Sequence, residues 1–503
     1  MIATSNLAAL AEEAFERRGD YRAVLFEGRW HGSGELFSRA AAVAGGLVEL
    51  GIAPGERVVV SMANCPEVSV VYQAVWRAGA VVTPATFLLS VEDLRHVIAD
   101  SAASAVITTP DLLDKVREAV AGLDHVRYVV TSDSGGLGKL EEAEPAAIVP
   151  RGEDDLAALL YTGGTTGRAK GVMLTHANLC FTGRAVQEAS HVAGVSRSLM
   201  TLPLSHSYGM LVTIAGMHSP EPPVTVLLRW FEPRVFLESI EEHRLQTSAV
   251  VPSMIHLLLA QPLEDFDLSC LQYLGCGAAP LAPQVAQEIE RRIPSMTVRQ
   301  GYGLTETAAL IATNPAGREK PGSVGVPIPG AVVRVLDEED RELPAGEAGE
   351  ICVRSPAVMR GYWRAGDRDP KLTAEAIRDG WLRTGDIGYL DEEGYLFIVD
   401  RKKDLIIRGG FNVYPRDVED ALLEHPAVMG AGVVGRPDER HGEEVVAFVA
   451  LREPDAVSAE ELIEWSRHRI GGYKYPREVH VVDAMPLTAV GKLDRKALRG
   501  RLL

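Results

Sequence analysis

Apolar and polar positions alternate with two different periods along the first third of the chain. Between residues 35 and 135, stretches with helical spacing such as SGELFSRAAAVAGGLVELGI are separated by short runs rich in β-branched residues: RVVVSM, GAVVTPA, SAVITT and VRYVVT. Such a change of period is typical of amphipathic helices that alternate with buried strands. This region therefore predicts a layered α/β structure built on a sheet.

The same alternation returns in the middle of the chain and then gives way to other patterns. Strand-like runs such as VTVLLRW and TSAVVP stand among helical stretches such as APQVAQEIERR, which predicts a second α/β layer. The stretch from AVVRVLDEEDRELPAGEAGEICVRS to GYLDEEGYLFIVD is rich in strands and turns, as expected for a small β-barrel. We predict a large domain over residues 1–400 and a compact α+β domain over residues 401–503.

Composition narrows the class of protein without pointing to one function. The 503 residues exceed what one hydrophobic core normally holds, so more than one domain is expected. The net charge of −18 argues against binding to nucleic acid, whose phosphates require a basic surface. The five cysteines are dispersed and lack metal-ligand spacing, which favours a reducing compartment. The amphipathic N-terminal stretch predicts neither a signal peptide nor a membrane span, so we expect a cytoplasmic protein.

The segment YTGGTTGRAKG, residues 161–171, concentrates glycine, threonine and lysine. Glycine permits close backbone approach to a ligand, and threonine hydroxyls with free N–H groups can surround a phosphate. The segment does not match the P-loop pattern, because Arg168 stands where that pattern requires glycine. A plain surface loop between apolar runs explains the composition equally well. The flanking sequences predict the order strand, loop, helix.

Seven further segments follow the glycine segment along the chain. They are PLSHSYGM, GCGAAPL, GYGLTET, GEICVRSP, RTGD, DRKKDLIIRGGFNVYPRDVE and PLTAVGKLDR. Together with YTGGTTGRAKG they resemble the ordered motifs of the adenylate-forming superfamily, and in particular those of fatty acyl-CoA synthetases. The resemblance implies an AMP-forming acid–thiol ligase that uses ATP, Mg²⁺ and coenzyme A. It also implies that the small C-terminal domain is mobile.

The resemblance also implies which residues bind the nucleotide and its metal ion. The phosphates are expected to be wrapped by Thr162, Gly163, Gly164, Thr165, Thr166 and Gly167. The remaining contacts to ATP or AMP are expected from Gly277, Ala278, Ala279, Tyr302, Gly303, Thr305, Glu306, Asp386, Arg401 and Lys492. Thr165 and Glu306 match the Mg²⁺ site, and a carboxylate is the hard ligand that this ion takes.

Three residues match catalytic positions of the superfamily: Lys492, His206 and Glu306. The resemblance implies that Lys492 neutralises charge at the α-phosphate in the first half-reaction and that His206 stands at the mouth of the acyl pocket. Lys403 occupies the hinge about which relatives rotate the C-terminal domain between half-reactions. After this rotation, coenzyme A is expected to contact Gly409, Gly410 and Arg477.

The acid is predicted from the residues expected to line the acyl pocket. These are His206, Tyr208, Ser253, Met254, Gly275, Cys276, Gly277 and Gly301, which are mostly apolar or small. The segments that carry them contain no arginine to pair with a second carboxylate, and an unpaired buried charge is costly. We therefore expect a hydrophobic, fatty or bulky, monocarboxylic acid.

Other functions of the same fold stay open at this point. One is an acyl-AMP enzyme that is specialised for a single half-reaction or that loads a carrier protein, and another is a relative without activity. The sequence shows no insertion between its large and small parts of the kind that acyl-AMP ligases carry, which favours coenzyme A. The expected partners are the acid, ATP, coenzyme A and a pathway enzyme that supplies or receives the acyl group, and a homodimer is left open.

Overall fold

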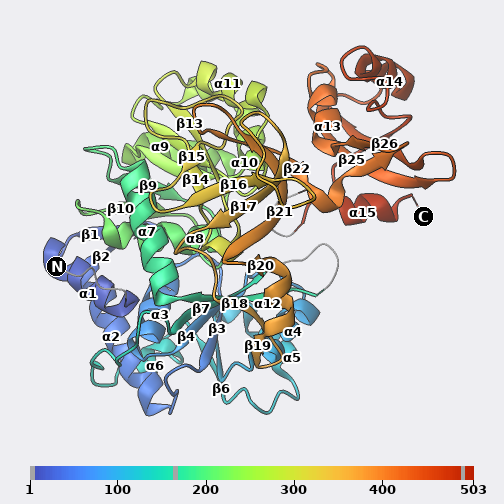
Figure 1. Cartoon of the computed structure of the whole chain (residues 1–503). Helices are drawn as coiled ribbons and strands as arrows, with labels where there is room; N and C mark the ends of the chain where they lie inside the picture. The colour runs from blue at the N-terminus through green and yellow to red at the C-terminus, as the bar shows by residue number, and fades with distance from the viewer. Residues whose placement is uncertain (1–5, 163–167, 489–492, 503) are drawn as a thin grey trace. The chain divides into compact units, whose positions relative to one another are not determined.

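The computed structural model describes residues 6–162, 168–488 and 493–502 (Figure 1). The chain divides into two compact units, each considered separately below. The first comprises Met1–Val332 and Val353–Leu382, and the second comprises Val333–Cys352 and Arg383–Leu503. The predicted domain boundary between residues 400 and 401 stays a prediction. Among the described residues, no helix combines the length and the apolar composition that crossing a membrane requires.

The first sheet of the first unit has eight strands in the order β19-β18-β8-β7-β4-β3-β5-β6. Their bounds are β3 (Arg57–Ser61), β4 (Val81–Pro84), β5 (Ala105–Thr108), β6 (Tyr128–Thr131), β7 (Leu156–Thr162), β8 (Lys170–Thr175), β18 (Gly361–Arg364) and β19 (Asp367–Asp369). The strands from β7 to β6 pair in parallel, whereas β8, β18 and β19 continue the sheet antiparallel. The four strands predicted before residue 135 are all present.

Helices cover both faces of this sheet, as parallel strands require. Val58 and Val60 pack into the core beneath α1, α2 and α3, whereas Val59 between them packs under α4 and α5. Trp76 of α3 is fully buried and donates its indole N–H to the Ala157 carbonyl at 2.9 Å. The bounds are α1 (Leu7–Arg18), α2 (Ser33–Glu49), α3 (Pro66–Arg77), α4 (Val91–Ser101), η1 (Pro110–Leu112), α5 (Leu113–Val120), α6 (Leu137–Leu140) and α12 (Pro370–Ala376).

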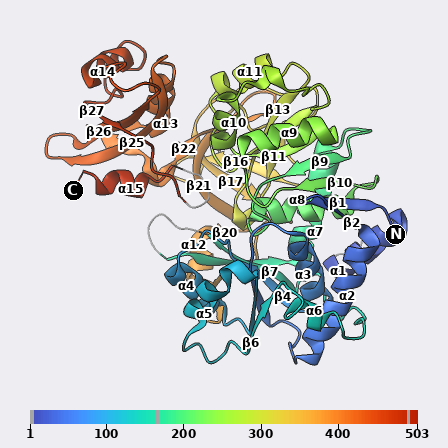
Figure 2. The ribbon, with the colours of Figure 1, turned by 180° about the vertical axis from the view of Figure 1, so that it is seen from behind.

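The second sheet of the first unit has nine strands in the order β15-β14-β13-β12-β11-β9-β10-β1-β2. The strands are β1 (Arg22–Phe26), β2 (Arg29–Gly32), β9 (Arg197–Met200), β10 (Val224–Leu227), β11 (Thr247–Val250), β12 (Tyr273–Cys276), β13 (Thr297–Tyr302), β14 (Ala312–Thr313) and β15 (Val326–Pro327). The helices are α7 (His176–Ser190), α8 (Ser207–His218), α9 (Pro233–His243), α10 (Pro252–Leu259), η2 (Leu263–Asp265), α11 (Pro283–Arg292) and η3 (Thr305–Thr307). In Figure 2, α9, α10 and α11 lie over one face of this sheet, and α8 packs on the other.

The predicted order strand, loop, helix around the glycine segment is wrong. The run KGVMLT forms strand β8, which pairs antiparallel with β7, and α7 begins only at His176. The short apolar run is compatible with either structure when read alone, and pairing with both β7 and β18 decides for a strand. The glycine segment therefore connects two strands of a hairpin rather than a strand and a helix.

Two further sheets lie wholly or mainly in the second unit. One has five strands in the order β16-β17-β21-β20, with β22 on β21, and it forms a half-barrel where a small barrel was predicted. Its strands are β16 (Val332–Leu336), β17 (Gly349–Arg354), β20 (Ile377–Arg378), β21 (Trp381–Leu390) and β22 (Leu396–Arg401). The other has the order β24-β23-β26-β25, with β27 on β26. Its elements are η4 (Lys402–Asp404), β23 (Ile406–Arg408), β24 (Phe411–Val413), α13 (Pro415–Leu423), β25 (Val428–Asp438), β26 (Gly442–Leu451), α14 (Ala459–Arg467), β27 (Glu478–Val482) and α15 (Arg495–Gly500). The α/β fold class is as predicted from the sequence.

A buried ion pair holds α15 to α13 in this second unit. Arg495 donates from Nη2 to both carboxylate oxygens of Glu419, at 2.6 and 2.8 Å, and the Val433 N–H also donates to Glu419. Burial raises the pKa of Glu419 and the Arg495 guanidinium opposes this shift. We expect Glu419→Ala to lower the free energy of unfolding by about 3–5 kcal/mol, because it leaves a buried guanidinium without its partner.

Urea denaturation of the full chain measures this loss. Glu419→Gln is the matched variant, since it keeps an acceptor for the Val433 N–H and removes only the charge, and its loss should be smaller. A change below about 1 kcal/mol in Glu419→Ala would mean that the pair behaves like an exposed salt bridge.

Candidate active site

Strand pairing joins the two ends of the glycine segment. Thr162 at the end of β7 pairs with Lys170 at the start of β8. The predicted phosphate-binding residues Gly163, Gly164, Thr165, Thr166 and Gly167 lie outside the described residues, as does Lys492. Their roles stay predictions.

Glu306 lies in η3, which begins shortly after the end of β13. Its oxygen Oε1 accepts a hydrogen bond from the Tyr362 hydroxyl at 2.7 Å, and its carbonyl accepts one from the Met359 N–H at 2.8 Å. Mg²⁺ in nucleotide sites is held by one or two carboxylates together with phosphate oxygens and water. The carboxylate of Glu306 is a donor of this kind, so the residue fits the predicted metal site.

The turn that follows β13 carries three predicted nucleotide contacts and is tightly packed. A Cβ on Gly303 would lie 2.3 Å from the Ala309 carbonyl oxygen, so this position requires glycine. Ala308 and Ala309 have positive φ angles of 49° and 84°, which non-glycine residues rarely adopt. Tyr302 ends β13 and Thr305 begins η3, so both lie within a few residues of this strained backbone.

The turn that follows β12 lies beside the turn that follows β13. Gly277, Ala278 and Ala279 directly follow β12, which pairs in parallel with β13. Ala278 has a φ angle of 69°, and a Cβ on Gly277 would come within 3.3 Å of the Gly301 carbonyl oxygen. The two turns therefore present backbone to each other at the ends of adjacent parallel strands, where ligands of α/β sheets commonly bind.

The segment PLSHSYGM meets the end of β12 through Tyr208. His206 caps α8, with its ring nitrogen Nδ1 accepting from the Tyr208 N–H at 3.3 Å. The Tyr208 hydroxyl donates to the Gly275 carbonyl at 3.1 Å. A Cβ on Gly277 would lie 3.7 Å from the Tyr208 ring. These contacts bring four of the predicted acyl-pocket residues together on the same side of the sheet.

The side chain of Cys276 points the other way. Successive strand residues face opposite sides of a sheet, and Cys276 is 2% exposed in the core beneath α9, α10 and α11. Burial raises the pKa of this thiol to about 12, so it stays protonated. The predicted pocket contact of Cys276 is thereby restricted to its backbone.

The last three predicted pocket residues lie at the edges of this region. Ser253 and Met254 belong to the first turn of α10, and the Thr201 hydroxyl contacts the Met254 sulfur at 3.9 Å. A Cβ on Gly301 would lie 2.9 Å from Leu310 Cδ1, so this glycine is packed against the chain that follows β13.

The second unit carries the predicted ribose and hinge residues. Asp386 on β21 pairs with Arg401 on β22, and Arg401 Nε lies 3.5 Å from the Asp386 carboxylate. The Asp386 side chain is only 8% exposed, whereas that of Arg401 is 42% exposed. Lys403 follows in η4, where burial and the nearby Arg401 lower its pKa.

The residues predicted to contact coenzyme A lie in this same unit. Gly409 and Gly410 form the two-residue turn between β23 and β24, with φ angles of 58° and 81°. Both angles are positive, which is the turn geometry that glycine permits and that matches the twist of paired strands. Arg477 donates to the Gly472 and Tyr475 carbonyls at 2.7 and 3.2 Å.

Sequence reasoning missed the residues that support the PLSHSYGM segment. Asn64 donates to the Leu202 carbonyl at 2.9 Å and accepts from the Leu204 N–H at 2.9 Å. The Tyr72 hydroxyl donates to the Leu204 carbonyl at 3.0 Å. Both side chains are almost fully buried. They lie 132 or more residues from the groups they hold, so no local pattern in the sequence indicates them.

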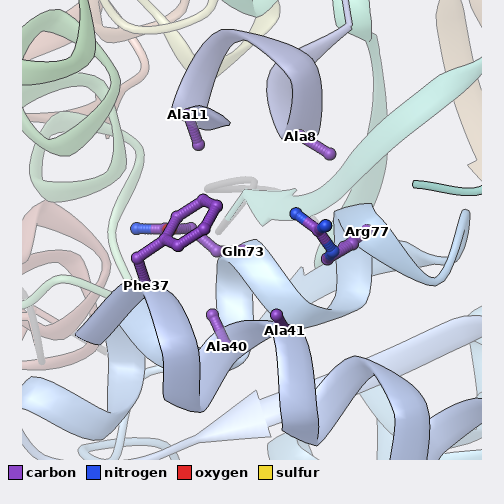
Figure 3. A pocket seen from close by; sticks show the side chains of 7 residues that line it. All are labelled: Ala8, Ala11, Phe37, Ala40, Ala41, Gln73 and Arg77. Atoms are coloured by element: carbon purple, nitrogen blue, oxygen red, sulfur yellow. The ribbon is translucent and has the colours of Figure 1, made fainter. Parts of the chain in front are cut away.

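Two other features do not form part of this site. Asp438, His441 and Glu444 approach one another within 4.8 Å, but Glu444 binds Arg408 and Asp438 accepts from backbone N–H groups. A space of about 10 Å³ lies between α1, α2 and α3. The residues that line it are Ala8, Ala11, Phe37, Ala40, Ala41, Gln73 and Arg77 (Figure 3). That volume suits about one water molecule, so we regard it as a packing gap.

Comparison with known proteins relates the whole chain to one family. The family described as AMP-binding enzyme matches residues 11–363, and the AMP-binding enzyme C-terminal domain matches residues 417–492. A feruloyl-CoA synthase of an Amycolatopsis species is 37% identical over 93% of both chains. A long-chain-fatty-acid–CoA ligase of Bacillus subtilis is 34% identical over 99% of this chain and 94% of its own.

A solved structure shares the fold over the same length. The crystal structure of ATP-bound MatB from Rhodopseudomonas palustris superposes with a TM-score of 0.89 at 32% identity. The match covers 99% of this chain and 98% of that one.

Proposed function

Because this chain belongs to the family of AMP-binding enzymes and is an ATP-dependent acyl-CoA synthetase within it, we propose that it activates a hydrophobic, fatty or bulky, monocarboxylic acid. Its cosubstrates are ATP and coenzyme A, with Mg²⁺ accompanying the nucleotide. The acid's carboxylate attacks the α-phosphate and expels pyrophosphate, and the thiol of coenzyme A then displaces AMP from the acyl-adenylate. Two relatives are named for feruloyl and long-chain fatty acyl groups, which are both largely apolar, whereas a third, 35% identical to this chain, is named as a sulfoacetate–CoA ligase.

Four residues of this chain are each assigned to a different part of the substrates. Glu306 would hold the cation that neutralises phosphate oxygens, and Lys492 would neutralise charge at the α-phosphate as the acid attacks. Asp386 would accept hydrogen bonds from the ribose hydroxyls, because one carboxylate can accept from both. His206, at the start of α8, would orient the acid at the mouth of its pocket.

The observation that carries the proposal about the acid is the contact between Tyr208 and β12. The wall there consists of an aromatic ring against Gly275 and Gly277, which have no side chains to fill the space. An aromatic ring and bare backbone suit an apolar chain or ring better than a second charge.

Arg299 is the cation on β13 that faces the same side of the sheet, since it pairs in register with Gly275. Its Nε lies 3.1 Å from the Glu319 carboxylate and its guanidinium stacks on Tyr273 at 4.3 Å, whereas its buried Nη1 makes no hydrogen bond within the described part of the chain. A second carboxylate of the acid would share this arginine with Glu319. The proposal of a monocarboxylic acid therefore rests on the apolar wall at Tyr208 rather than on this arginine.

A panel of fatty, aryl and polycyclic acids, with short dicarboxylic acids included, tests the proposal. Pyrophosphate release is measured with ATP and Mg²⁺, with and without coenzyme A, and acyl-CoA is measured directly. Apolar monocarboxylic acids should give the highest kcat/KM for both products. Activity restricted to dicarboxylic acids would overturn the assignment of the acid while leaving the ligase class intact.

The same panel separates the alternative enzymes that the sequence left open. Pyrophosphate without thioester would indicate an acyl-AMP enzyme that serves another acceptor, such as a carrier protein. Thioester from a supplied acyl-adenylate, with none from the free acid, would indicate an enzyme specialised for the second half-reaction.

We predict that Gly277→Val narrows the range of acids. A Cβ at this position already comes within 3.7 Å of Tyr208, so two further methyl groups would occupy the space in front of the ring. Because Gly277 is also a predicted nucleotide contact, the acids are compared with one another: kcat/KM for the longest or bulkiest accepted acid should fall by about tenfold or more relative to that for the shortest one. Gly216→Ala on α8 is the control, because nothing lies within 4 Å of its Cβ position. An unchanged ranking of acids in Gly277→Val would remove this glycine from the pocket.

A further inference from the structure

Glu306 is held from two sides by a segment that is distant in the sequence. The Tyr362 hydroxyl donates to its Oε1 at 2.7 Å, and the Met359 N–H donates to its carbonyl at 2.8 Å. The first contact joins residues 56 positions apart and fixes the side chain, whereas the second fixes the main chain. Of the two carboxylate oxygens, the described contact engages Oε1.

Tyr362 is itself held rigidly. It lies in β18, opposite Val172 of β8, and its side chain is buried with a residue exposure of 7%. Its N–H donates to the Thr373 hydroxyl at 3.0 Å. A Cβ on Gly361 would lie 2.7 Å from the same hydroxyl, so glycine is required for this close approach. These contacts fix the position of Tyr362, so its hydroxyl donates from one place.

The two residues Trp363 and Tyr362 make contacts on opposite faces of β18. Trp363 points to the opposite face and donates its indole N–H to the Asp100 carbonyl of α4 at 2.9 Å. Lys170 lies on the same face as Val172, two residues along β8, and its ammonium sits 5.2 Å from the centre of the Tyr362 ring. A cation within about 6 Å of the centre of an aromatic ring is attracted by the quadrupole of the ring, so Lys170 helps to hold the Tyr362 ring in place.

The Tyr362 hydroxyl donates to one of the two oxygens of the Glu306 carboxylate, Oε1. A carboxylate with one oxygen occupied by such a donor is restricted in rotation, and it presents its other oxygen in a defined direction. Mg²⁺ demands near-ideal octahedral geometry, so its affinity depends on that direction.

We infer that Tyr362 is a positioning residue, which orients the Glu306 carboxylate for the divalent cation that accompanies ATP. The inference rests on the proposed role of Glu306 as the metal ligand. The geometry resembles that of other metal sites, in which a ligating carboxylate is itself held by a hydrogen bond.

The test is the effect of Mg²⁺ on nucleotide binding by Tyr362→Phe. Calorimetric titration of the full chain gives the dissociation constant of ATP with Mg²⁺ and with EDTA, and their ratio is the magnesium enhancement. Loss of one hydrogen bond to a charged group should reduce this enhancement about tenfold. Affinities for AMP and for metal-free ATP should stay within about twofold, because the ring and its packing are retained.

Tyr161→Phe is the matched control. The Tyr161 hydroxyl also donates to a carboxylate at 2.7 Å, that of Asp100, and it lies in β7 of the same sheet. Both variants should lose similar thermal stability, but Tyr161→Phe should keep the magnesium enhancement of the wild type.

Two outcomes would overturn the inference: an unchanged enhancement in Tyr362→Phe, or an equal reduction in both variants. Failure of the proposed function would show in the wild-type chain rather than in the variants. A wild-type chain that binds ATP with a clear magnesium enhancement but releases no pyrophosphate with any acid would refute the proposed reaction and leave the role of Tyr362 measurable. A wild-type chain without magnesium enhancement would refute the metal role of Glu306 and this inference with it.

Discussion

Lys492→Ala is expected to lower the rate of pyrophosphate release by about 10²–10³-fold, which is the usual cost of removing one group that stabilises charge in the transition state. Thioester formation from a supplied acyl-adenylate and coenzyme A should stay within about threefold of the wild type. The difference arises because the lysine is expected to meet the α-phosphate while the acid attacks it, and this charge has already been redistributed once the adenylate exists.

The measurement is a pair of single-turnover assays, one for each half-reaction. Lys496→Ala provides the control, since this lysine lies in the same C-terminal stretch, is exposed and has no assigned role. Equal losses in the two half-reactions of Lys492→Ala would contradict the role assigned to it, and unchanged pyrophosphate release would remove it from the site altogether.

Lys403→Pro is expected to impair thioester formation far more than pyrophosphate release. Proline restricts φ to about −65°, so it opposes a rotation of the backbone at the hinge. We expect thioester formation from a supplied adenylate to fall about a hundredfold, the scale of loss when a reacting group is misplaced by about 1 Å. Pyrophosphate release should change only a few fold, provided that the first half-reaction uses the backbone conformation that proline permits.

Lys403→Ala separates the backbone effect from the side chain, because it removes the ammonium and leaves φ free. It should retain both half-reactions. A Lys403→Pro variant that performs both steps at wild-type rates would contradict a hinge at this position. Loss of adenylation alone would mean that the substituted chain is trapped in the other conformation, so the hinge would stand but the order of conformations would be reversed.

The α/β layers could be predicted because they depend on local patterns. A parallel strand covered on both faces must be apolar throughout, and RVVVSM and SAVITT are short enough to exclude a helix. The hairpin at β7 and β8 could not be predicted in the same way. GVML directly precedes a helix, and only pairing with β18, nearly 190 residues away, decides that it is a strand.

The residues of the candidate site likewise divide into those that the local sequence indicates and those that only the fold reveals. Glu306, Asp386 and His206 stand in short segments that resemble motifs of the adenylate-forming superfamily, so they could be proposed from the sequence. Cys276 was included for its place in GCGAAPL, and only the strand shows that its side chain faces the core. Tyr362 and Asn64 could not be found, because each acts on a group far along the chain.

The sequence alone was thus enough to predict a layered α/β protein and the family of its motifs, and to propose the residues that handle ATP. These depend on contiguous residues, whose spacing is visible without a fold. The tertiary structure alone decided that the glycine segment joins two strands, that Tyr208 meets β12 and that Tyr362 holds Glu306. Each of these contacts joins residues that only strand pairing and core packing bring together, and no local pattern encodes such a meeting.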